Sequence, residues 1–370
     1  MGAILLHINS AASACMKMSA IHRACWARVY PGGFDPMSRF FYRALASKRI
    51  AALMNIMVGH YATIYMIHRP RPRDGAYEGV SPELLEECIV YAKAAGFEFA
   101  SIDEVIEKAR NKQKPDRPTL CFTLDDGYED QLEQLVPILL KHQCKPTLFT
   151  IVDMVDGIDW PWDSKISAAV WNTPQKQLAF DFNNHAFALD FSEPHARRAS
   201  RRQLTRFGKS LPAAQLEQYV TALLSALDVE PHGPAPAEYK PSTWDSLRKA
   251  EQAGLRIGSH ACSHRVFAAL SDAQIQQELQ RAQAVLAREL VNPSRVFCYP
   301  SGTLNDFSLH HTQLVKDTQF FIGAVTSMPG NISQQQIAQQ PFLVKRHSFP
   351  ASFDKFVRYS SWLEYIRSRI

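Results

Sequence analysis

The sequence predicts an α/β barrel of about seven or eight strand–helix units, and three observations lead to that prediction. The chain has 370 residues, of which 46% are hydrophobic and 21% are charged, so it can bury a large core. Short apolar runs alternate with amphipathic stretches, a rhythm typical of parallel strands joined by helical crossovers. That many units over roughly 300 residues fit a barrel better than an open sheet.

Each predicted strand is a short apolar run, and each predicted helix has apolar residues at helical spacing. The predicted strands cover residues 62–67, 97–102, 120–124, 147–152, 255–258, 295–299, 320–325 and 343–346. The predicted helices cover residues 82–95, 103–109, 130–142, 213–226, 243–253 and 272–290. Ser81 and Ser271 are the predicted N-caps of two of these helices, and Pro82 fits a first helical position.

Two parts of the chain depart from this rhythm. Residues 1–36 show no clear period, so we expect either a disordered N-terminal arm or sequence upstream of a natural start at Met37. Residues 37–58 predict an N-terminal helix, and 59–370 form the predicted barrel domain. Within it, residues 153–241 hold three tryptophans, an arginine cluster and a proline-rich loop. We predict that this stretch is a long insertion at the carboxyl ends of the strands, forming a lid or a substrate wall.

Composition argues against several classes of protein. The net charge of +5 is small and spread out, which predicts no nucleic-acid partner. Seven scattered cysteines without a Cys-x-x-Cys pair indicate a reducing compartment. The first residues lack an export signal and no membrane span is predicted, so we expect a cytoplasmic protein. The oligomeric state is left open. The arginine cluster is interpreted as a solvated face; it comprises Arg197, Arg198, Arg201, Arg202 and Arg206.

Two carboxylates end an otherwise apolar predicted strand. Asp125 and Asp126 are adjacent and would repel each other unless a cation or a proton lies between them. Gly127 allows a sharp turn, so both side chains can face one cavity. The alternative is a turn in which the two aspartates cap the following helix, and these residues alone do not decide between the two.

Two histidines follow another predicted strand. His260 and His264, at positions i and i+4 of a helical turn, would present their imidazoles side by side, as a divalent metal requires. The alternative is a pair of capping or surface histidines. Together with Asp126 they form a three-ligand set that leaves room for water, as catalytic zinc sites do, and Asp125 is then free to act as a base.

Two further strand ends carry candidate groups. The turn Tyr299-Pro300-Ser301-Gly302 could aim the Ser301 amide at a developing oxyanion, although an ordinary strand-to-helix turn is equally compatible. His347, after the last predicted strand, is a candidate proton donor to a leaving group, with a structural histidine as the alternative.

These segments resemble the first three motifs of the polysaccharide deacetylase family, carbohydrate esterase family 4. The likeness extends from about residue 62 to 347 and includes Ile67-His68-Arg69, where many relatives have Tyr-His-Arg. It implies a distorted (β/α) barrel of about seven strands, a divalent metal (zinc first, with cobalt or nickel as alternatives) and removal of acetyl groups from a carbohydrate. It also implies that Asp125 is the catalytic base and that the metal ligands are Asp126, His260 and His264.

The chain departs from the family pattern in three motifs. Cys298 stands at the position of the arginine that orients the base, so Arg346 or Arg69 must substitute for it if the role is kept. Ser301 stands at the position of a tyrosine. The fourth motif, an Asp and Trp pair, is not found. The Leu-x-His of the fifth is approximated by Lys345-Arg346-His347.

The function predicted from these residues is metal-dependent hydrolysis of N-acetyl groups, less readily O-acetyl groups, on a carbohydrate. Asp125 would take a proton from the attacking water, the Ser301 amide would hold the oxyanion, and His347 would protonate the leaving amine. Trp160, Trp162 and Tyr128 are candidates to stack on sugar rings, with core packing as the alternative. Two other functions stay open: hydrolysis of linear C–N amide bonds in small molecules, and carbohydrate binding without catalysis.

Overall fold

The computed structural model describes residues 61–72, 79–113, 115, 117–230 and 233–367. Contacts divide the chain into Met1–Leu45 and Ala46–Ile370, and every described residue belongs to the second unit. The predicted arm (1–36) and N-terminal helix (37–58) lie outside the described residues, and the domain boundaries stay predictions. No helix in the described part has the length and hydrophobicity of a membrane span.

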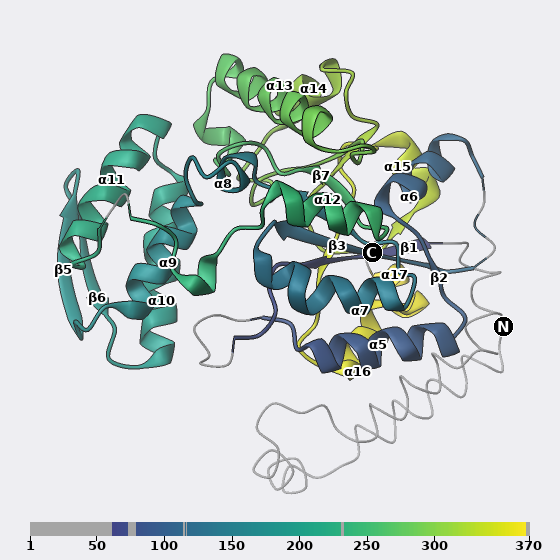
Figure 1. Ribbon diagram of the computed structural model, residues 1–370, viewed down its shortest axis with the longest axis horizontal. Coiled ribbons are helices and arrows are strands. Elements are labelled where there is room, and N and C mark those ends of the chain that lie inside the picture. Colours follow the sequence, from purple (N-terminus) through teal and green to yellow (C-terminus); the bar gives the residue numbers. More distant parts are fainter. Residues whose placement is uncertain (1–60, 73–78, 114, 116, 231–232, 368–370) are drawn as a thin grey trace, which may run out of the picture. The chain divides into compact units, whose positions relative to one another are not determined.

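Seven parallel strands form one curled sheet, which confirms the predicted distorted α/β barrel (Figure 1). In spatial order they are β11 (His347–Ser348), β1 (Tyr61–Ile67), β3 (Thr119–Asp126), β4 (Thr147–Thr150), β7 (Arg256–Ser259), β8 (Val296–Cys298) and β9 (Gly323–Val325). A short parallel strand, β2 (Glu98–Phe99), lies beside β3, and β10 (Ile332–Ser333) pairs antiparallel with β1. Val344 bridges Val325 of β9 just before β11 reaches β1, so this segment links the two ends of the curl.

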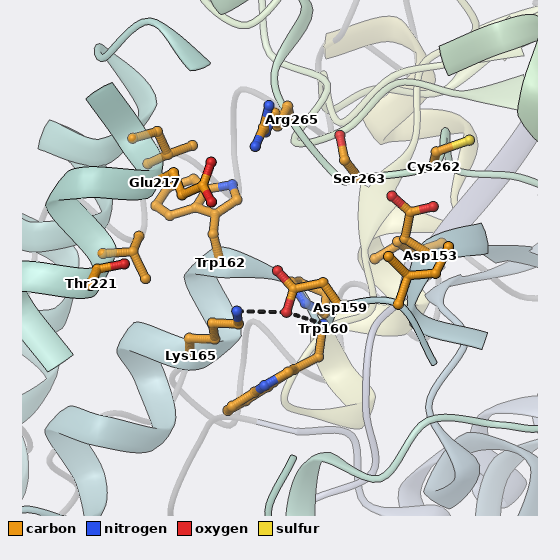
Figure 2. Close-up of a pocket in the computed structure, with 15 residues that line it drawn as sticks. Asp153, Asp159, Trp160, Trp162, Lys165, Glu217, Thr221, Cys262, Ser263 and Arg265 are labelled. Carbon is orange, nitrogen blue, oxygen red and sulfur yellow. Dashed lines mark hydrogen bonds and ion pairs between the residues drawn. The ribbon is translucent and has the colours of Figure 1, made fainter. Parts of the chain in front are cut away.

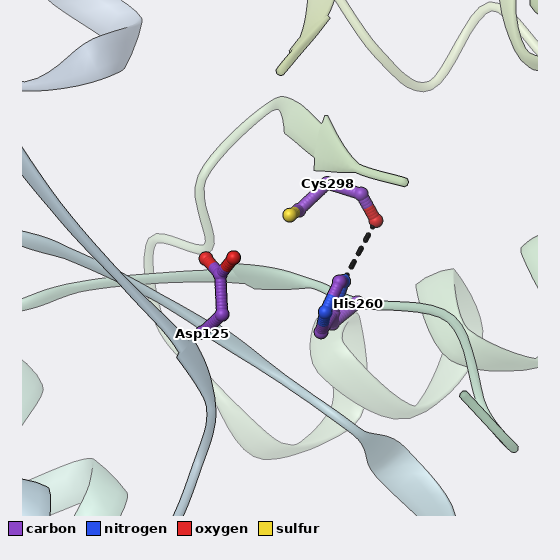
Figure 3. A group of neighbouring side chains, drawn as sticks. All are labelled: Asp125, His260 and Cys298. Carbon is purple, nitrogen blue, oxygen red and sulfur yellow. Dashed lines mark hydrogen bonds between the residues drawn. The ribbon is translucent and has the colours of Figure 1, made fainter. Parts of the chain in front are cut away.

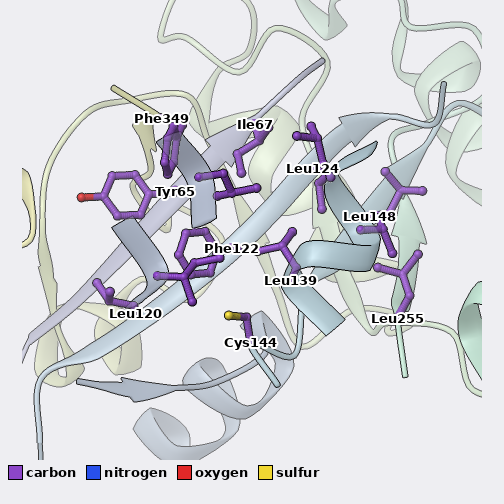
Figure 4. Packing of buried hydrophobic residues seen from close by; sticks show 14 of the residues in the cluster. Tyr65, Ile67, Leu120, Phe122, Leu124, Leu139, Cys144, Leu148, Leu255 and Phe349 are labelled. Atoms are coloured by element: carbon purple, nitrogen blue, oxygen red, sulfur yellow. The ribbon is translucent and has the colours of Figure 1, made fainter. Parts of the chain in front are cut away.

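The strand side chains alternate between two hydrophobic clusters. Leu120, Phe122 and Leu124 of β3 pack outward beneath the helices (Figure 4), whereas Cys121 belongs to a second cluster inside the curl. The outer helices include α5 (Pro82–Ala94), α7 (Val136–Lys141), α12 (Trp244–Gln252), α13 (Asp272–Glu289) and α16 (Phe353–Tyr359). Two helices belong to the inner cluster: α6 (Ile102–Arg110) and α15 (Gln334–Gln339). These clusters fill both faces of the sheet, and the carboxylates of Asp125 and Asp126 lie at its carboxyl edge.

Most predicted elements are present, and the differences have local causes. Ser81 accepts a hydrogen bond from the Leu84 amide at 3.3 Å, as the N-cap prediction requires. The predicted strand 97–102 shrinks to β2 because Ser101 already caps α6 in a capping box with Glu104. The predicted helix 130–142 begins with a π-helical turn, Gln131–Leu135, and becomes α-helical just before Pro137, which has no amide hydrogen to donate.

The predicted strand 343–346 is wrong in its position. Only Val344 makes a bridge there, and ladder pairing begins at His347. Two helices in this part of the chain were not predicted. They are α14 (Leu309–Asp317), which lies between β8 and β9, and α17 (Trp362–Arg367), which follows α16. The apolar pair Leu343 and Val344 predicted a strand at this place, but here the chain crosses from one end of the sheet to the other.

The predicted insertion leaves the sheet at the carboxyl end of β4 and returns before β7. It contains α8 (Val152–Val155), α9 (Trp162–Asn172), the hairpin β5 (Gln177–Phe182) and β6 (His185–Asp190), α10 (Pro194–Lys209), α11 (Ala213–Ala226) and a 3₁₀ turn, Ala237–Tyr239. Helices α9, α10 and α11 and the hairpin, which lie together in Figure 1, enclose a hydrophobic cluster of their own. Only α11 was predicted from the sequence. The arginine cluster lies on α10, where Arg197 donates to the carbonyls of Val170, Trp171 and Thr173 and so holds the end of α9.

Candidate active site

Both aspartates of the first motif belong to the end of β3. The strand runs through Asp126, which has a φ of 87°, and Gly127 follows with a φ of 96°. A Cβ atom at Gly127 would lie 2.4 Å from the Thr150 hydroxyl oxygen, so both the space and the dihedral require glycine. The turn begins one residue earlier than the sequence predicts, and it swings the Asp126 carboxylate towards the loop after β7.

The structure brings Asp126 together with His260 and His264. One carboxylate oxygen of Asp126, Oδ1, lies 3.7 Å from the Nε2 atom of each imidazole. The two rings are 4.9 Å apart, and all three side chains are buried. The predicted helical turn is wrong: residues 260–264 form a loop with left-handed backbone at Ala261 and His264, where φ is 62° and 57°. Strained backbone of this kind clusters at functional sites because it fixes side chains in one geometry.

The three side chains fit a divalent metal ion. Within the described part of the chain, Asp126 Oδ1 is buried and has no hydrogen-bond partner, which costs free energy unless a cation approaches it. An ion with bonds of about 2.0–2.1 Å to nitrogen and oxygen can lie between atoms 3.7 Å apart. His260 Nδ1 donates to the Cys298 carbonyl at 2.9 Å, so the lone pair of Nε2 faces Asp126. Their assignment as metal ligands stays a prediction that this geometry supports.

A carboxylate from the insertion faces the other side of His264. Asp163, at the start of α9, places Oδ1 3.4 Å from His264 Nδ1. Burial disfavours charge on both groups, but their mutual attraction is stronger. It lowers the pKa of Asp163 to about 2, and together with Asp126 it raises the pKa of His264 to about 9. The sequence did not single out Asp163, because only the tertiary fold brings α9 to the histidine loop.

Replacing Asp163 with asparagine is expected to weaken metal binding by about tenfold, since carboxylates beside metal-bound imidazoles raise their basicity and fix their orientation. Calorimetric titration of metal-free protein with zinc measures this directly. The matched control is Asp159→Asn, because Asp159 lies on the same segment but pairs with Lys165 at 2.6 Å instead of with a histidine. Equal zinc affinity in the two variants would contradict the prediction.

The other aspartate, Asp125, is held by an arginine from the last part of the barrel. Arg346 Nη1 and Nη2 donate to the two carboxylate oxygens of Asp125 at 2.7 and 2.9 Å. The guanidinium also donates to the Thr326 carbonyl at 2.9 Å, to the Thr123 hydroxyl at 2.9 Å and to the Cys298 sulfur at 3.1 Å. Burial opposes charge on Asp125, yet Arg346 holds the pKa of this carboxyl well below its usual range. Asp125 is therefore an ionised carboxylate with a fixed orientation.

Of the two arginines that the sequence offered, the structure places Arg346 on Asp125. Arg69 forms an ion pair with Asp130 at 2.6 Å and lies over the rings of Tyr128 and Tyr239. Cys298 belongs to β8, and its sulfur lies against the Arg346 guanidinium. The Asp125 carboxylate is thus held by an arginine from the opposite end of the curl.

Asp125, His260 and Cys298 form a second group of buried potential ligands (Figure 3). Both oxygens of Asp125 already accept hydrogen bonds from Arg346, and the same guanidinium contacts the Cys298 sulfur. His260 Nδ1 is bonded to the Cys298 carbonyl. Because these atoms are paired and a guanidinium lies beside them, this group suits a cation less well than Asp126 with the two imidazoles.

The structure does not bring His347 to the other site residues. In the parallel ladder His347 is level with Tyr65, whose side chain is in the outer cluster, and its ring stacks on Tyr359 at 4.8 Å. Its Nε2 lies 3.0 Å from the Asn331 amide oxygen, and burial lowers the pKa of His347 to about 4. Adjacent strand residues point to opposite faces, so Arg346 points in and His347 points out. This placement argues against the predicted role as proton donor.

Ser301 lies in the predicted turn after β8 and has a φ of 60°. The following Gly302 has a φ of 68°, and a Cβ atom there would come within 2.9 Å of the Ser327 amide nitrogen. The Ser327 hydroxyl donates to the Ser301 carbonyl, which holds the turn against the next strand connection. The predicted oxyanion contact of the Ser301 amide stays a prediction.

A cavity of about 260 Å³ lies where the insertion meets the histidine loop (Figure 2). Trp160 and Trp162 line it, as do Ser263 and Arg265 from the loop and its continuation. Tyr128 does not line it; its hydroxyl lies 2.6 Å from the Ser164 hydroxyl. Two of the three aromatic residues proposed for sugar stacking therefore border this cavity, and that role stays a prediction for them.

Comparisons with known proteins agree with this architecture. The model of the polysaccharide deacetylase family matches residues 112–319, more than half of the chain. No match was found among curated proteins. Similar solved structures include the deacetylase PplD of Streptococcus pyogenes in complex with acetate, with 16% identity, a TM-score of 0.54, and coverage of 81% of this chain and 98% of PplD.

Two further structures are similar. IcaB of Ammonifex degensii has 15% identity, a TM-score of 0.52, and coverage of 82% of this chain and 97% of its own. BC0361, a polysaccharide deacetylase from Bacillus cereus, has 13% identity, a TM-score of 0.51, and coverage of 81% and 69%. At these identities the likeness shows a shared fold, and the match of the family model shows descent. The chain, with the predicted motifs at the carboxyl edge of its sheet, belongs to the polysaccharide deacetylase family.

Proposed function

We propose that this protein is a metal-dependent hydrolase that removes N-acetyl groups from an amino-sugar-containing carbohydrate. One observation carries the proposal: Asp126, His260 and His264 converge around a space suited to a cation, beside a second carboxylate held separately by Arg346. A non-catalytic relative would have no need to keep one carboxylate without a hydrogen bond and another ionised. Family membership supports a carbohydrate as the substrate.

The side chains divide the chemistry between them. A divalent ion at this site, zinc first among the candidates, supplies Lewis acidity for water and for the acetyl carbonyl. Asp126, His260 and His264 would hold it, with the imidazole tautomer of His260 set by the Cys298 carbonyl. Asp125 accepts the proton of the attacking water, and Arg346 fixes the orientation of that carboxylate.

We favour an N-acetyl (amide) substrate over an O-acetyl (ester) substrate because the proposed chemistry depends on proton transfer. A departing amine needs a proton, whereas the sugar oxygen of an acetate ester leaves more readily without one. The turn at Ser301 is the proposed source of a backbone donor to the tetrahedral oxyanion. Trp160 and Trp162 are proposed to contact neighbouring sugars from the insertion.

Removal of the metal is expected to stop acetate release completely, and zinc is expected to restore it. Purified protein is incubated with N-acetylated oligosaccharides, an O-acetylated glycan and a linear N-acyl amide, with free acetate and new primary amines measured before and after dialysis against a chelator. Acetate release that survives dialysis would contradict metal dependence. Hydrolysis of the linear amide alone would favour the small-molecule amidase function, and glycan binding without acetate release would favour a binding protein.

A further inference from the structure

We propose that one face of α10 binds the carboxylates of an acidic glycan, so that the acetylated substrate contains uronic acid residues. This inference rests on the proposed function and names the substrate class of the same site. α10 holds six Arg and Lys residues, among them the arginine cluster that the sequence interprets as a solvated face, and it holds no acidic residue. Three of the six, Arg198, Arg202 and Lys209, form what we call the basic row.

The basic row runs along one side of α10. Its members are separated by four and then seven positions, which are about one and two turns of an α-helix, so their side chains leave the helix axis within about 40° of one another. Arg198 and Lys209 are separated by about 16 Å along the axis, at 1.5 Å per residue. The row is therefore long enough to contact several successive sugars of a linear glycan.

One end of the basic row adjoins the candidate active site. Lys209 Nζ lies 3.6 Å from Asp306 Oδ1, in the loop after β8, and the Lys209 side chain stays 35% exposed, so this ammonium group can bind a further anion. A Cβ atom at Gly208 would come within 2.6 Å of the Trp162 ring, so α10 lies directly against the start of α9. Burial raises the pKa of Asp163 and its histidine partner lowers it, and the charge of Lys209 lowers it further.

The positive charges of the row are not balanced within the described part of the chain. There, the guanidinium groups of Arg198 and Arg202 form no ion pair or hydrogen bond, whereas the neighbouring Arg197 donates to three carbonyls at the end of α9. Arg198, Arg202 and Arg206 follow one another at intervals of four residues, and like charges at this spacing repel on a helix. A bound polyanion would remove this repulsion.

The composition of α10 favours a carboxylated sugar chain over other polyanions. A planar guanidinium binds a planar carboxylate through two parallel hydrogen bonds. Single-stranded nucleic acid needs aromatic side chains on which its bases stack, but the one Phe, Tyr or Trp side chain of α10, Phe207, packs against the hydrophobic cluster of the insertion. A helix that binds a membrane surface exposes large apolar side chains, and α10 exposes none. Family membership supports a carbohydrate.

Binding is tested with an oligogalacturonate hexamer, which carries carboxylates but no acetyl group, and with the same hexamer after reduction of its carboxylates to alcohols. Calorimetry on the zinc-loaded full chain is expected to give about tenfold tighter binding of the acidic form, and about 0.5 M NaCl should remove most of this difference by screening. Arg198→Gln combined with Arg202→Gln should weaken binding of the acidic form by about tenfold. The matched control, Arg110→Gln combined with Arg295→Gln, removes the same charge from exposed residues at the end of α6 and the start of β8 and should stay within about twofold.

Three outcomes would overturn the proposal. The first is equal affinity of the wild type for the two hexamers. The second is an equal loss of binding in the control variant, once circular dichroism shows that both variants fold. The third is tighter binding of a phosphorylated glycan, of single-stranded DNA or of anionic lipid vesicles than of oligogalacturonate, because a phosphate would then be the preferred ligand.

Turnover separates this proposal from the proposed function. Acetate release is measured on an oligosaccharide in which N-acetylglucosamine alternates with glucuronic acid, and on its carboxyl-reduced form. We expect a KM about tenfold lower for the acidic form, and a ratio close to one in the Arg198→Gln and Arg202→Gln double variant. Binding of oligogalacturonate without acetate release from any N-acetylated glycan would refute the proposed function and leave the basic row as a binding surface. Acetate release with equal KM for both forms, in protein that does not bind oligogalacturonate, would refute the role of the basic row and leave the proposed function.

Discussion

Replacing Asp126 with alanine is expected to abolish zinc binding and acetate release together while leaving the fold intact. Asp126 supplies the single carboxylate of the proposed ligand set, and two imidazoles alone bind a divalent ion weakly. The metal-free protein should lose no stability, because Asp126 Oδ1 makes no hydrogen bond in the described structure and burial raises the pKa of this carboxyl. Metal content by mass spectrometry, acetate release and urea unfolding with a chelator measure the three effects.

Asp125→Asn separates the two carboxylates. It should keep zinc, because Asp125 is bonded to Arg346 and is not among the proposed ligands, but it should lose activity by at least about 10² fold, since an amide cannot act as the base. A full equivalent of zinc bound to Asp126→Ala would refute the assignment of the metal site. Loss of zinc from Asp125→Asn would instead point to the group shown in Figure 3.

Replacing Arg346 with methionine is expected to destabilise the protein by about 3–5 kcal/mol at neutral pH, because it leaves the buried Asp125 carboxylate without its partner. Asp125 and Arg346 are 2% and 1% exposed, so water cannot take over the lost hydrogen bonds. Activity should also fall, since nothing then orients the base. The free energy of unfolding from urea titrations, together with acetate release, checks both effects.

The dependence of this destabilisation on pH has a definite sign. In the wild type the folded pKa of Asp125 is depressed, so the pair stabilises the fold above the unfolded pKa and this contribution is lost as pH falls through the folded value. In Arg346→Met the main interaction that lowers the pKa of Asp125 is lost, and burial, the largest cause, is expected to raise this pKa, so the variant should recover part of the deficit as the pH falls. The double variant Arg346→Met with Asp125→Asn should recover it at neutral pH. A deficit below about 1 kcal/mol, or one that the second substitution does not reduce, would contradict this account.

The residues at the centre of the site were predictable because each follows its strand directly. Asp125 and Asp126 end one apolar run, and His260 follows another. Parallel strands end at the same edge of a sheet, so local patterns suffice to predict that these groups meet, although they are far apart in the chain. The predicted helical turn at His260 was wrong, because side-chain spacing does not reveal the left-handed residues of a loop.

The choice between neighbours was not predictable from the sequence. Lys345, Arg346 and His347 are consecutive, and shifting the register by one residue exchanges which side chain faces the inside of the curled sheet. The ladder of β11 with β1 decides that Arg346 faces inward and His347 outward.

No motif in the sequence around Asp163 indicated a functional role. It belongs to an insertion of which the sequence revealed one helix, and its contact with His264 joins positions about a hundred residues apart. Helices α9 and α10 and the hairpin of the insertion were not predicted, because polar residues interrupt the regular spacing of their apolar residues.

The sequence by itself determined the fold class, the family and the residues that end the strands, because backbone periodicity and turn chemistry are local properties of the chain. The tertiary structure alone decided which arginine holds Asp125, on which face of the sheet His347 lies and which carboxylate lies beside His264. Those outcomes depend on register and on contacts between distant segments, where a displacement of one residue reverses the direction of a side chain.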